Sequence, residues 1–367
     1  MKADESTPSF DVIVSLDRSD KTVAVAVLDV ARDVFLVECD VSTAPEALDA
    51  WWQDLRREHA KARIAVAFEQ PAPNLIAFFA VRRPAAIYAL NPSATFSYRN
   101  ALSVSHARND QSDARDQARF VAHAWAQLSP WTAPRVQVEH LERLTLNRRK
   151  LVNQRTGITN RLQATLKRYY PQSIELMNKH LWRPINLAFL RRWPRPTKLR
   201  RATQKSLKTF YQKHGSRSVK QWESRWAVIE EIVALGEVNP ADELEVSVML
   251  NQIEVLNAGI TDHDKAIAEL LASEGKKAER VSALPGAGPI YAPRIYAALE
   301  RHVPNCAGPE SLAAAVGIAP ITDQSGKMRK VQRRLRCDTF TRQSFVEWAK
   351  ESWKHSVWAE AFYRQRE

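Results

Sequence analysis

Four acidic residues have the types and the spacing needed for chemistry on phosphodiesters. Asp17 ends the apolar run FDVIVSLD, and Glu69 ends the apolar run ARIAVAFE. Asp110 and Asp113 lie three residues apart in RNDQSDARDQARFVAH, so a helix over this segment places both on one face. A carboxylate at the end of a buried strand costs free energy unless a cation pairs with it. Four converging carboxylates predict a site for two hard divalent cations, with Mg²⁺ as the expected ion, of the kind that cuts or transfers phosphodiesters.

The elements that must position these acids predict a mixed α/β domain over residues 10–130. Three strand-like runs, DVIVSLD, KTVAVAVLD and DVFLVECDV, are separated by short polar breaks and predict an antiparallel meander. A helix with Thr43 as its N-cap follows, and then strand RIAVAFE, helix NLIAFFAVRR, strand AAIYALN and a further helix. This is the order of a ribonuclease-H-like (RuvC-like) architecture, in which the first and fourth strands lie side by side. Such a sheet brings Asp17 and Glu69 together.

Each acid also has an ordinary structural explanation. Asp17 could belong to the turn that follows its strand, and Glu69 could end its strand before Gln70-Pro71. Asp110 and Asp113 could be first-turn residues that the helix dipole favours. The placement of all four at strand ends and one helix start, in this order, favours the catalytic interpretation.

The net charge of +13 is concentrated in one segment. From Arg135 to Lys220 there are 22 Lys and Arg residues against three acids, a balance of +19 that leaves −6 for the rest of the chain. A solvated helical face normally mixes both signs, so a block of one sign predicts a phosphate-binding surface. Within it we predict nucleic-acid contacts by four arginines, Arg191, Arg192, Arg200 and Arg201.

Composition excludes several classes of protein. An apolar content of 45% and a charged content of 26% are ordinary for a soluble chain of 367 residues with two or three domains. No apolar run reaches the ~18 residues that span a bilayer, and MKADESTPSF lacks the apolar segment of a secretory signal. Three cysteines cannot all pair, and His302 with Cys306 does not complete a zinc set. We therefore expect a cytoplasmic, nucleoid-associated protein with no membrane partner.

Residues 131–275 are typical of long helices with few breakers. The apolar positions of the first helix are close to a heptad seam and predict a coiled coil: Leu141, Leu144, Leu151, Ile158, Leu162 and Leu166. A second long run, ELEVSVMLNQIEVLNAGITDHDKAIAELLA, could return antiparallel, and the seam could also be a dimer interface. Trp182, Trp193 and Trp222 could stack on bases, although such residues more often cap a small core.

Residues 276–367 predict a small, mostly α domain. SALPGAGPIYAPRIYAALE has the pattern of a helix–hairpin–helix, in which Gly286 and Gly288 allow a close approach to a nucleic-acid backbone. Ser325 follows in a polar turn with Gly326, and a run of cations comes next: Lys327, Arg329, Lys330, Arg333, Arg334 and Arg336. A serine beside clustered cations could attack a phosphodiester, although alone it would be an ordinary turn residue. We predict that Lys327, Arg329 and Lys330 also contact nucleic acid.

Together these regions resemble the DEDD transposases of the insertion-sequence one-ten (IS110) family, from about Asp11 to the basic run after Ser325. A RuvC-like domain of that family carries the pattern D…E…D-x-x-D, which the four acids match. Its C-terminal transposase domain carries P-G-x-G-x-x-x-A, here PGAGPIYA, and a G-L-A-P-like box, here GIAP from Gly317 to Pro320. The serine-glycine pair that follows in the family is Ser325-Gly326 here.

The resemblance implies a bridge-RNA-guided DNA recombinase. In such a protein the serine joins covalently to a DNA phosphate, the acidic site binds magnesium, and a noncoding RNA selects donor and target DNA. A coiled-coil middle would assemble homodimers or homotetramers. The sequence departs from the family after the basic run, where a glycine and a leucine- and arginine-rich helix give way to CDTFTRQSFVEWAK. Two alternatives remain open at this point, a RuvC-like hydrolytic nuclease and a non-catalytic nucleic-acid-binding protein.

Overall fold

The computed structural model describes most of the chain, and the chain divides into two compact units, Met1–Ala133 and Pro134–Glu367. The described residues are 10–102, 109–177, 180–215, 219–232, 238–326, 328–335 and 337–365, with the side chains of 219–222 excepted. The predicted three-part division at residues 130 and 275 stays a prediction.

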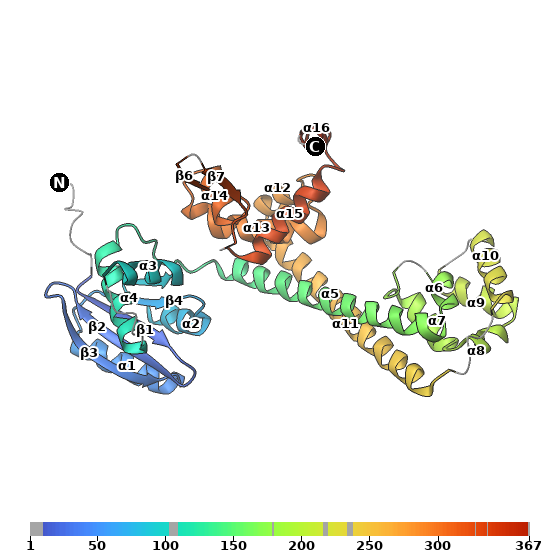
Figure 1. Ribbon diagram of the computed structural model, residues 1–367, viewed down its shortest axis with the longest axis horizontal. Coiled ribbons are helices and arrows are strands. Elements are labelled where there is room, and N and C mark those ends of the chain that lie inside the picture. The colour runs from blue at the N-terminus through green and yellow to red at the C-terminus, as the bar shows by residue number, and fades with distance from the viewer. Residues whose placement is uncertain are drawn as a thin grey trace. The chain divides into compact units, whose positions relative to one another are not determined.

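The first unit is built on a five-stranded sheet with the order β3-β2-β1-β4-β5 (Figure 1). The first three strands pair antiparallel, whereas β1, β4 and β5 run parallel. The predicted order of strands and helices and the pairing of the first strand with the fourth are confirmed. The strands are β1 (Val12–Arg18), β2 (Thr22–Asp29), β3 (Val34–Ser42), β4 (Ile64–Glu69) and β5 (Ala86–Leu90).

The two faces of this sheet pack against different helices. Alternate residues Val12, Val14 and Leu16 share a core with α1 (Pro45–Glu58) and α2 (Pro73–Arg82). The intervening residues, among them Ile13, Ala65 and Ala67, pack instead on α4 (Asp110–Ala124), which follows α3 (Pro92–Leu102). Side chains alternate between faces along a strand, so residues 17 and 69 belong to the α4 face.

The start of helix α1 differs from the prediction, whereas α4 begins where the acids require it. Helix α1 has Ala44 as its N-cap, without a side-chain cap, so the prediction for Thr43 was wrong. The Thr43 hydroxyl instead donates to the backbone oxygen of Lys21, 3.2 Å away. Helix α4 is capped reciprocally by Asn109 and Ser112, and this capping box fixes the position of its first turn.

The second unit is organised by two long helices, α5 (Val136–Tyr169) and α11 (Pro240–Ser273). They run antiparallel, because Arg148 pairs with Asp264 near one end and Arg168 pairs with Asp242 near the other. The antiparallel return is therefore confirmed, whereas the supercoil of a coiled coil stays a prediction. The seam is at least partly intramolecular, since buried seam residues share cores with α11: Leu141, Leu162 and Leu166.

One end of this helix pair carries a small helical core (Figure 1). Trp193 is only 5% exposed there and contacts Phe189 and Phe210, so this tryptophan is a core residue. Trp182 is partly buried under Arg155, and the side chain of Trp222 lies outside the described residues. The helices are α6 (Gln172–Leu176), α7 (Pro184–Arg192), α8 (Pro196–Arg200), α9 (Gln204–Lys213) and α10 (Val219–Glu230).

The other end carries the C-terminal elements. Tyr296 and Ala297 pack against the α5–α11 pair, and Ile295 packs against Phe345. Within the described part of the chain, no helix combines the length and the apolar character needed to cross a membrane. The elements are α12 (Lys276–Ser282), α13 (Gly288–His302), a 3₁₀ turn (Val303–Asn305), α14 (Pro309–Ala315), β6 (Ile321–Ser325), β7 (Met328–Gln332), α15 (Thr339–Ser352) and α16 (Val357–Arg364).

Candidate active site and nucleic-acid surface

The four predicted acids meet at the carboxyl edge of the first sheet. Asp17 is the last residue but one of β1 and Glu69 is the last residue of β4, and the residues before them, Leu16 and Phe68, are partners in the parallel register of these strands. Asp110 and Asp113 enter from the first turn of α4. Burial, followed by the negative charges of Asp113, Glu69 and Asp110, raises the pKa of Asp17 to about 6. The structure therefore brings the other three acids within electrostatic reach of Asp17.

Polar neighbours hold three of these carboxylates. The Gln117 amide donates to Asp17 Oδ1 at 3.2 Å and partly offsets the rise in its pKa. Glu69 accepts a hydrogen bond from the Thr95 hydroxyl. Arg99, whose side chain is 12% exposed, forms 3.0 Å ion pairs with both Asp113 and Asp116.

The sequence analysis missed these partners. Gln117 follows Asp113 by four residues on the same helix, and this spacing could have placed the amide on the acid face. Thr95 and Arg99 belong to α3: Thr95 meets Glu69 at the end of β4, and Arg99 meets Asp113 through the packing of α3 on α4. No sequence spacing indicates either contact.

The four acids have the oxygen ligands of a hard-cation site, but Asp113 and Glu69 already have other partners. Among the described residues, no three or more His, Cys, Asp or Glu side chains are arranged so that they could hold a metal ion. Asp113 is paired with Arg99, and Glu69 with Thr95. Carboxylate oxygens are the ligands that magnesium prefers, and the raised pKa of Asp17 reflects its burial and the negative charge of the neighbouring acids.

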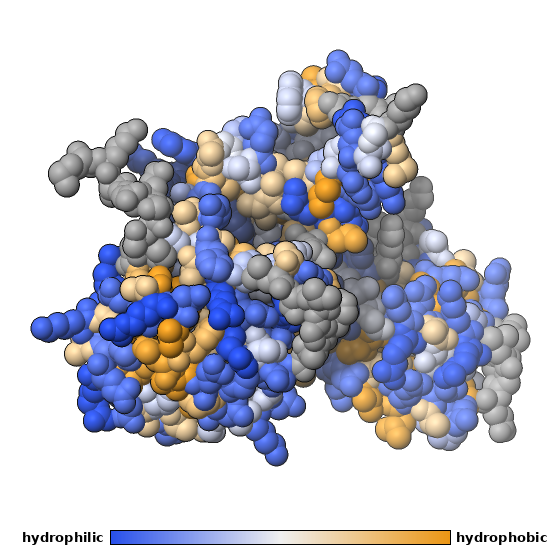
Figure 2. Space-filling view, turned by 60° about the vertical axis from the view of Figure 1, so that its left-hand side comes forward, coloured by the Kyte–Doolittle hydropathy of each residue, from blue (hydrophilic) through white to orange (hydrophobic). Residues whose placement is uncertain are grey.

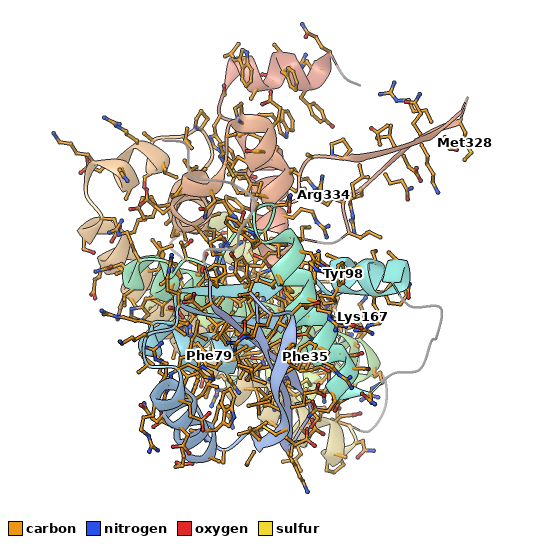
Figure 3. The ribbon with its side chains drawn as sticks, turned by 90° about the vertical axis from the view of Figure 1, so that its left-hand side faces the viewer. Phe35, Phe79, Tyr98, Lys167, Met328 and Arg334 are labelled. Atoms are coloured by element: carbon orange, nitrogen blue, oxygen red, sulfur yellow. The ribbon has the colours of Figure 1, made fainter. Side chains whose placement is uncertain are left out.

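Ser325 is the last residue of β6, directly before the turn of the β6–β7 hairpin, and its register partner is Met328. Gly326 continues into the turn with φ +57°. Figure 3 shows Met328 at the outer end of this hairpin and Arg334 where the chain returns from it. Every described strand residue of the hairpin is exposed, including Arg329 and Lys330. No described residue hydrogen-bonds the Ser325 hydroxyl, and Lys327 and Arg336 lie outside the described residues.

The predicted turn with two glycines connects α12 to α13. Gly286 has φ +72°, and a Cβ there would lie 2.9 Å from the Cα of Ser352 at the end of α15. The backbone of this turn is therefore packed against α15, and Trp348 donates to the Pro285 carbonyl at 2.9 Å. Gly288 has φ +49°, and a Cβ there would meet open space. Of the two glycines, Gly288 is the one whose surroundings leave room for a ligand.

Several arginines of the basic segment form ion pairs with acids elsewhere in the same unit. Helix α11 carries seven acidic residues and one lysine, and several of these acids face arginines of the basic block. The ion pairs between the basic block and α11 are Arg148–Asp264, Arg161–Glu245, Arg168–Asp242, Arg168–Glu245, Arg191–Glu254 and Arg195–Glu243. The free positive charge along the helix pair is therefore smaller than the sequence count indicates.

The four arginines predicted to contact nucleic acid have different surroundings. Arg191 pairs with Glu254 at 2.6 Å, and Arg192 lies over the Trp193 ring, 4.8 Å from its centroid. Arg200 and Arg201 are exposed at the end of α8, and neither forms an ion pair with a described residue. Hydrophilic residues predominate on the visible surface of this helical end in Figure 2.

Comparison with known proteins connects both sites to one activity. Residues 14–171, which include all four acids, match the model of DEDD transposases of the IS110 type, described as "Transposase". Residues 278–364, which include the hairpin, match a model described as "Transposase IS116/IS110/IS902 family". The chain is also 26% identical over 287 residues to the "Mini-circle putative transposase for IS117" of Streptomyces coelicolor, an alignment that covers 76% of this chain and 69% of that one.

The raised pKa of Asp17 predicts a stability gain from its neutralisation. Above pH 6 Asp17 is ionised in the folded chain, and its ionisation costs more free energy there than in the unfolded chain, where the pKa of the group is 3.8. A shift of this size corresponds to about 3 kcal/mol, which solvent screening of a partly exposed carboxyl reduces to about 1 kcal/mol. Asp17→Asn should therefore raise the melting temperature at pH 7.5 in chelator, and this gain should shrink as pH falls from 6 to 3.8.

The matched control is Asp20→Asn in the exposed turn after β1. This variant should leave the melting temperature nearly unchanged at pH 7.5 and throughout the fall from pH 6 to 3.8. A loss of stability in Asp17→Asn at pH 7.5 would contradict the account of a strained carboxylate.

Proposed function

We propose that this chain, which belongs to the IS110 family of transposases, cleaves and rejoins DNA strands with its acidic cluster and with Ser325. A transposase is a DNA-cleaving and recombining enzyme, so DNA is its substrate. The observation that carries the proposal is the convergence of Asp17, Glu69, Asp110 and Asp113 on one sheet edge, where each of the other three raises the pKa of Asp17.

We assign the acidic cluster to the binding of divalent cations, with magnesium as the expected ion. Asp17, Glu69, Asp110 and Asp113 would hold the ions, which when bound stabilise charge on attacking and leaving phosphodiester oxygens. Binding requires Asp113 to exchange its contact with Arg99 for the cation. Arg99 then remains paired with Asp116 and stays close to the site, where its charge can face a phosphate.

Metal binding should be measurable without any DNA. Saturating Mg²⁺ or Mn²⁺ should raise the melting temperature of the wild-type chain, since a ligand that binds only the folded state at 100 times its Kd contributes about 2.7 kcal/mol. Asp17→Asn and Glu69→Gln should lose most of this gain, because each removes a ligand and a charge. Asp20→Asn should keep it. An equal metal-induced shift in Asp17→Asn and in the wild type would show that the ions bind elsewhere.

We assign Ser325 the role of nucleophile. Its hydroxyl oxygen forms a bond to a DNA phosphorus, one P–O ester bond of the strand breaks, and the freed DNA oxygen takes up a proton while the serine loses one. Arg329 and Lys330 lie on the strand that pairs with β6 and would stabilise charge on the phosphate. No described residue supplies a base to the hydroxyl, so the reaction needs the acidic cluster of the same subunit or of a partner in a dimer or tetramer.

Substitution of Ser325 distinguishes the recombinase mechanism from that of a hydrolytic nuclease. Ser325→Ala should form no covalent protein–DNA adduct on a denaturing gel and should lose strand exchange by at least about a thousandfold, because the nucleophile is gone. Asp17→Ala should also be inactive, and mixing the two inactive chains should restore part of the activity if the sites act across subunits. Metal-dependent cleavage at the normal rate by Ser325→Ala would establish the nuclease alternative instead.

Nucleic-acid binding by the helical end of the second unit rests on its exposed cations. We propose that Arg200 and Arg201, which have no ion pair among the described residues, contact phosphates of DNA or of a guide RNA. Guidance by a bridge RNA is the property that family membership suggests for this surface. Gly288, Arg329, Lys330 and Lys327 would contact DNA near the serine, and Arg191 and Arg192 would add to the contacts of the helical end. Gly286, also predicted from the sequence, would support the contact at Gly288 through the packing of its turn on α15.

The two kinds of arginine give a matched test. The double change Arg200→Glu and Arg201→Glu should weaken RNA or DNA binding at 150 mM salt by about tenfold or more and should make binding less sensitive to salt, because two free charges are reversed. Arg191→Glu should weaken binding less, since Arg191 already faces Glu254. Equal losses in both variants, measured by fluorescence anisotropy across a salt series, would show that the ion pair does not shield Arg191.

A further inference from the structure

The β6–β7 hairpin stands out from its unit with little support along its strands. All described strand residues are exposed, and an isolated two-stranded ribbon is marginally stable in water. Its direction must therefore be set where the chain enters it after α14 and leaves it before α15. The GIAP segment occupies the entry, and Cys337 follows the exit.

The entry contains a glycine that two separate constraints require. Gly317 ends α14 in a left-handed conformation with φ +81°. Its amide donates to the Ala314 carbonyl and the Ile318 amide donates to the Ala313 carbonyl, as in a Schellman motif. A Cβ at Gly317 would also overlap the Cys337 side chain, with only 2.7 Å to its Cβ and less to its Sγ. The residues that flank the two ends of the hairpin are thus in direct contact.

Arg342 of α15 lies beside the contact between Gly317 and Cys337 and binds the chain where it leaves the hairpin. Arg342 Nη1 donates to the Arg334 carbonyl at 2.5 Å and lies 3.3 Å from Cys337 Sγ. The Arg342 Cβ would lie 3.4 Å from a Cβ at Gly317. Helix α15 is itself held by Phe345, which packs with Ile295 of α13 in a shared core. The exit of the hairpin is therefore tied to a packed helix.

We propose that Gly317, Cys337 and Arg342 form a hairpin-base clamp that sets the direction in which Ser325 is presented. The clamp rests on the proposed role of Ser325, and its members are positioning residues that touch no substrate. Ser325 lies four residues beyond Ile321, the first residue of β6, which is about 13 Å at ~3.3 Å per residue. A tilt of about 10° at the base of the hairpin would move the serine by about 2 Å, and a misplacement of about 1 Å already costs roughly a hundredfold in rate.

A steric exchange tests the clamp. Gly317→Ala inserts a Cβ against Cys337 at a left-handed φ, so it should lower the melting temperature. At a temperature where the variant is still folded, it should slow formation of the covalent adduct by at least about tenfold, with little change in DNA affinity. Cys337→Gly removes the atoms that the new Cβ meets, so the double variant Gly317→Ala, Cys337→Gly should recover most of the rate. Gly275→Ala is the matched control, because Gly275 also has a left-handed φ, +65°, but a Cβ there meets nothing within 4 Å.

A second readout does not depend on the serine. Backbone amides of the hairpin should exchange hydrogen faster in Gly317→Ala and in Arg342→Ala than in the wild type, and should return toward the wild-type rate in the double variant. Arg342→Lys should resemble Arg342→Ala, since an ammonium lacks the planar guanidinium that reaches both the Arg334 carbonyl and Cys337.

These outcomes separate the clamp from the serine mechanism. If Ser325→Ala remains active, the nucleophile assignment fails, while hydrogen exchange still tests the clamp. Wild-type exchange and adduct rates in Gly317→Ala would overturn the clamp, as would a failure of Cys337→Gly to rescue either readout.

Discussion

Repulsion among carboxylates at one edge of a buried sheet is the constraint on which the first unit depends. Asp17 lies near the end of β1 on the face that α4 covers, and burial together with three further acids raises its pKa. The fold answers with polar partners that flank the acids, namely the Gln117 amide, the Thr95 hydroxyl and the Arg99 guanidinium. These partners let the sheet and helices assemble, yet they leave charge for a cation to neutralise. Stability is thus sacrificed at the position where a phosphodiester would be activated.

The second proposed site has the opposite construction. The acids lie on the ends of packed elements, whereas Ser325 lies at the outer end of a hairpin whose strands are exposed. In the proposed clamp the position of Ser325 is set at the base of the hairpin, where Gly317 contacts Cys337, and not by residues around the serine itself. Under the proposed mechanism the serine would need a base from another part of the protein or from a second subunit, since no described residue hydrogen-bonds its hydroxyl.

Local sequence patterns were sufficient to predict the acidic site, and contacts distant in sequence were not. Asp17 and Glu69 could be placed because alternation along a strand and the order of elements determine the face and the edge. Arg99 could not, because its ion pairs depend on how α3 packs on α4. The count of basic residues likewise could not show that Arg191 pairs with Glu254, because the two are 63 residues apart in sequence. The requirement for glycine at 317 is likewise set by Cys337, which lies on the far side of the hairpin.

Paired charges along the α5–α11 rod have a consequence for geometry. Each helix has 34 residues, which corresponds to a length of about 50 Å at 1.5 Å per residue. Carboxylates of α11 occupy several arginines of α5, so a polyanion gains little by lying along the rod. Under the proposed function, contacts with phosphate would then fall to the elements packed at its two ends. The length of the helix pair, roughly that of 15 base pairs of duplex, sets the scale of the distance between those contacts.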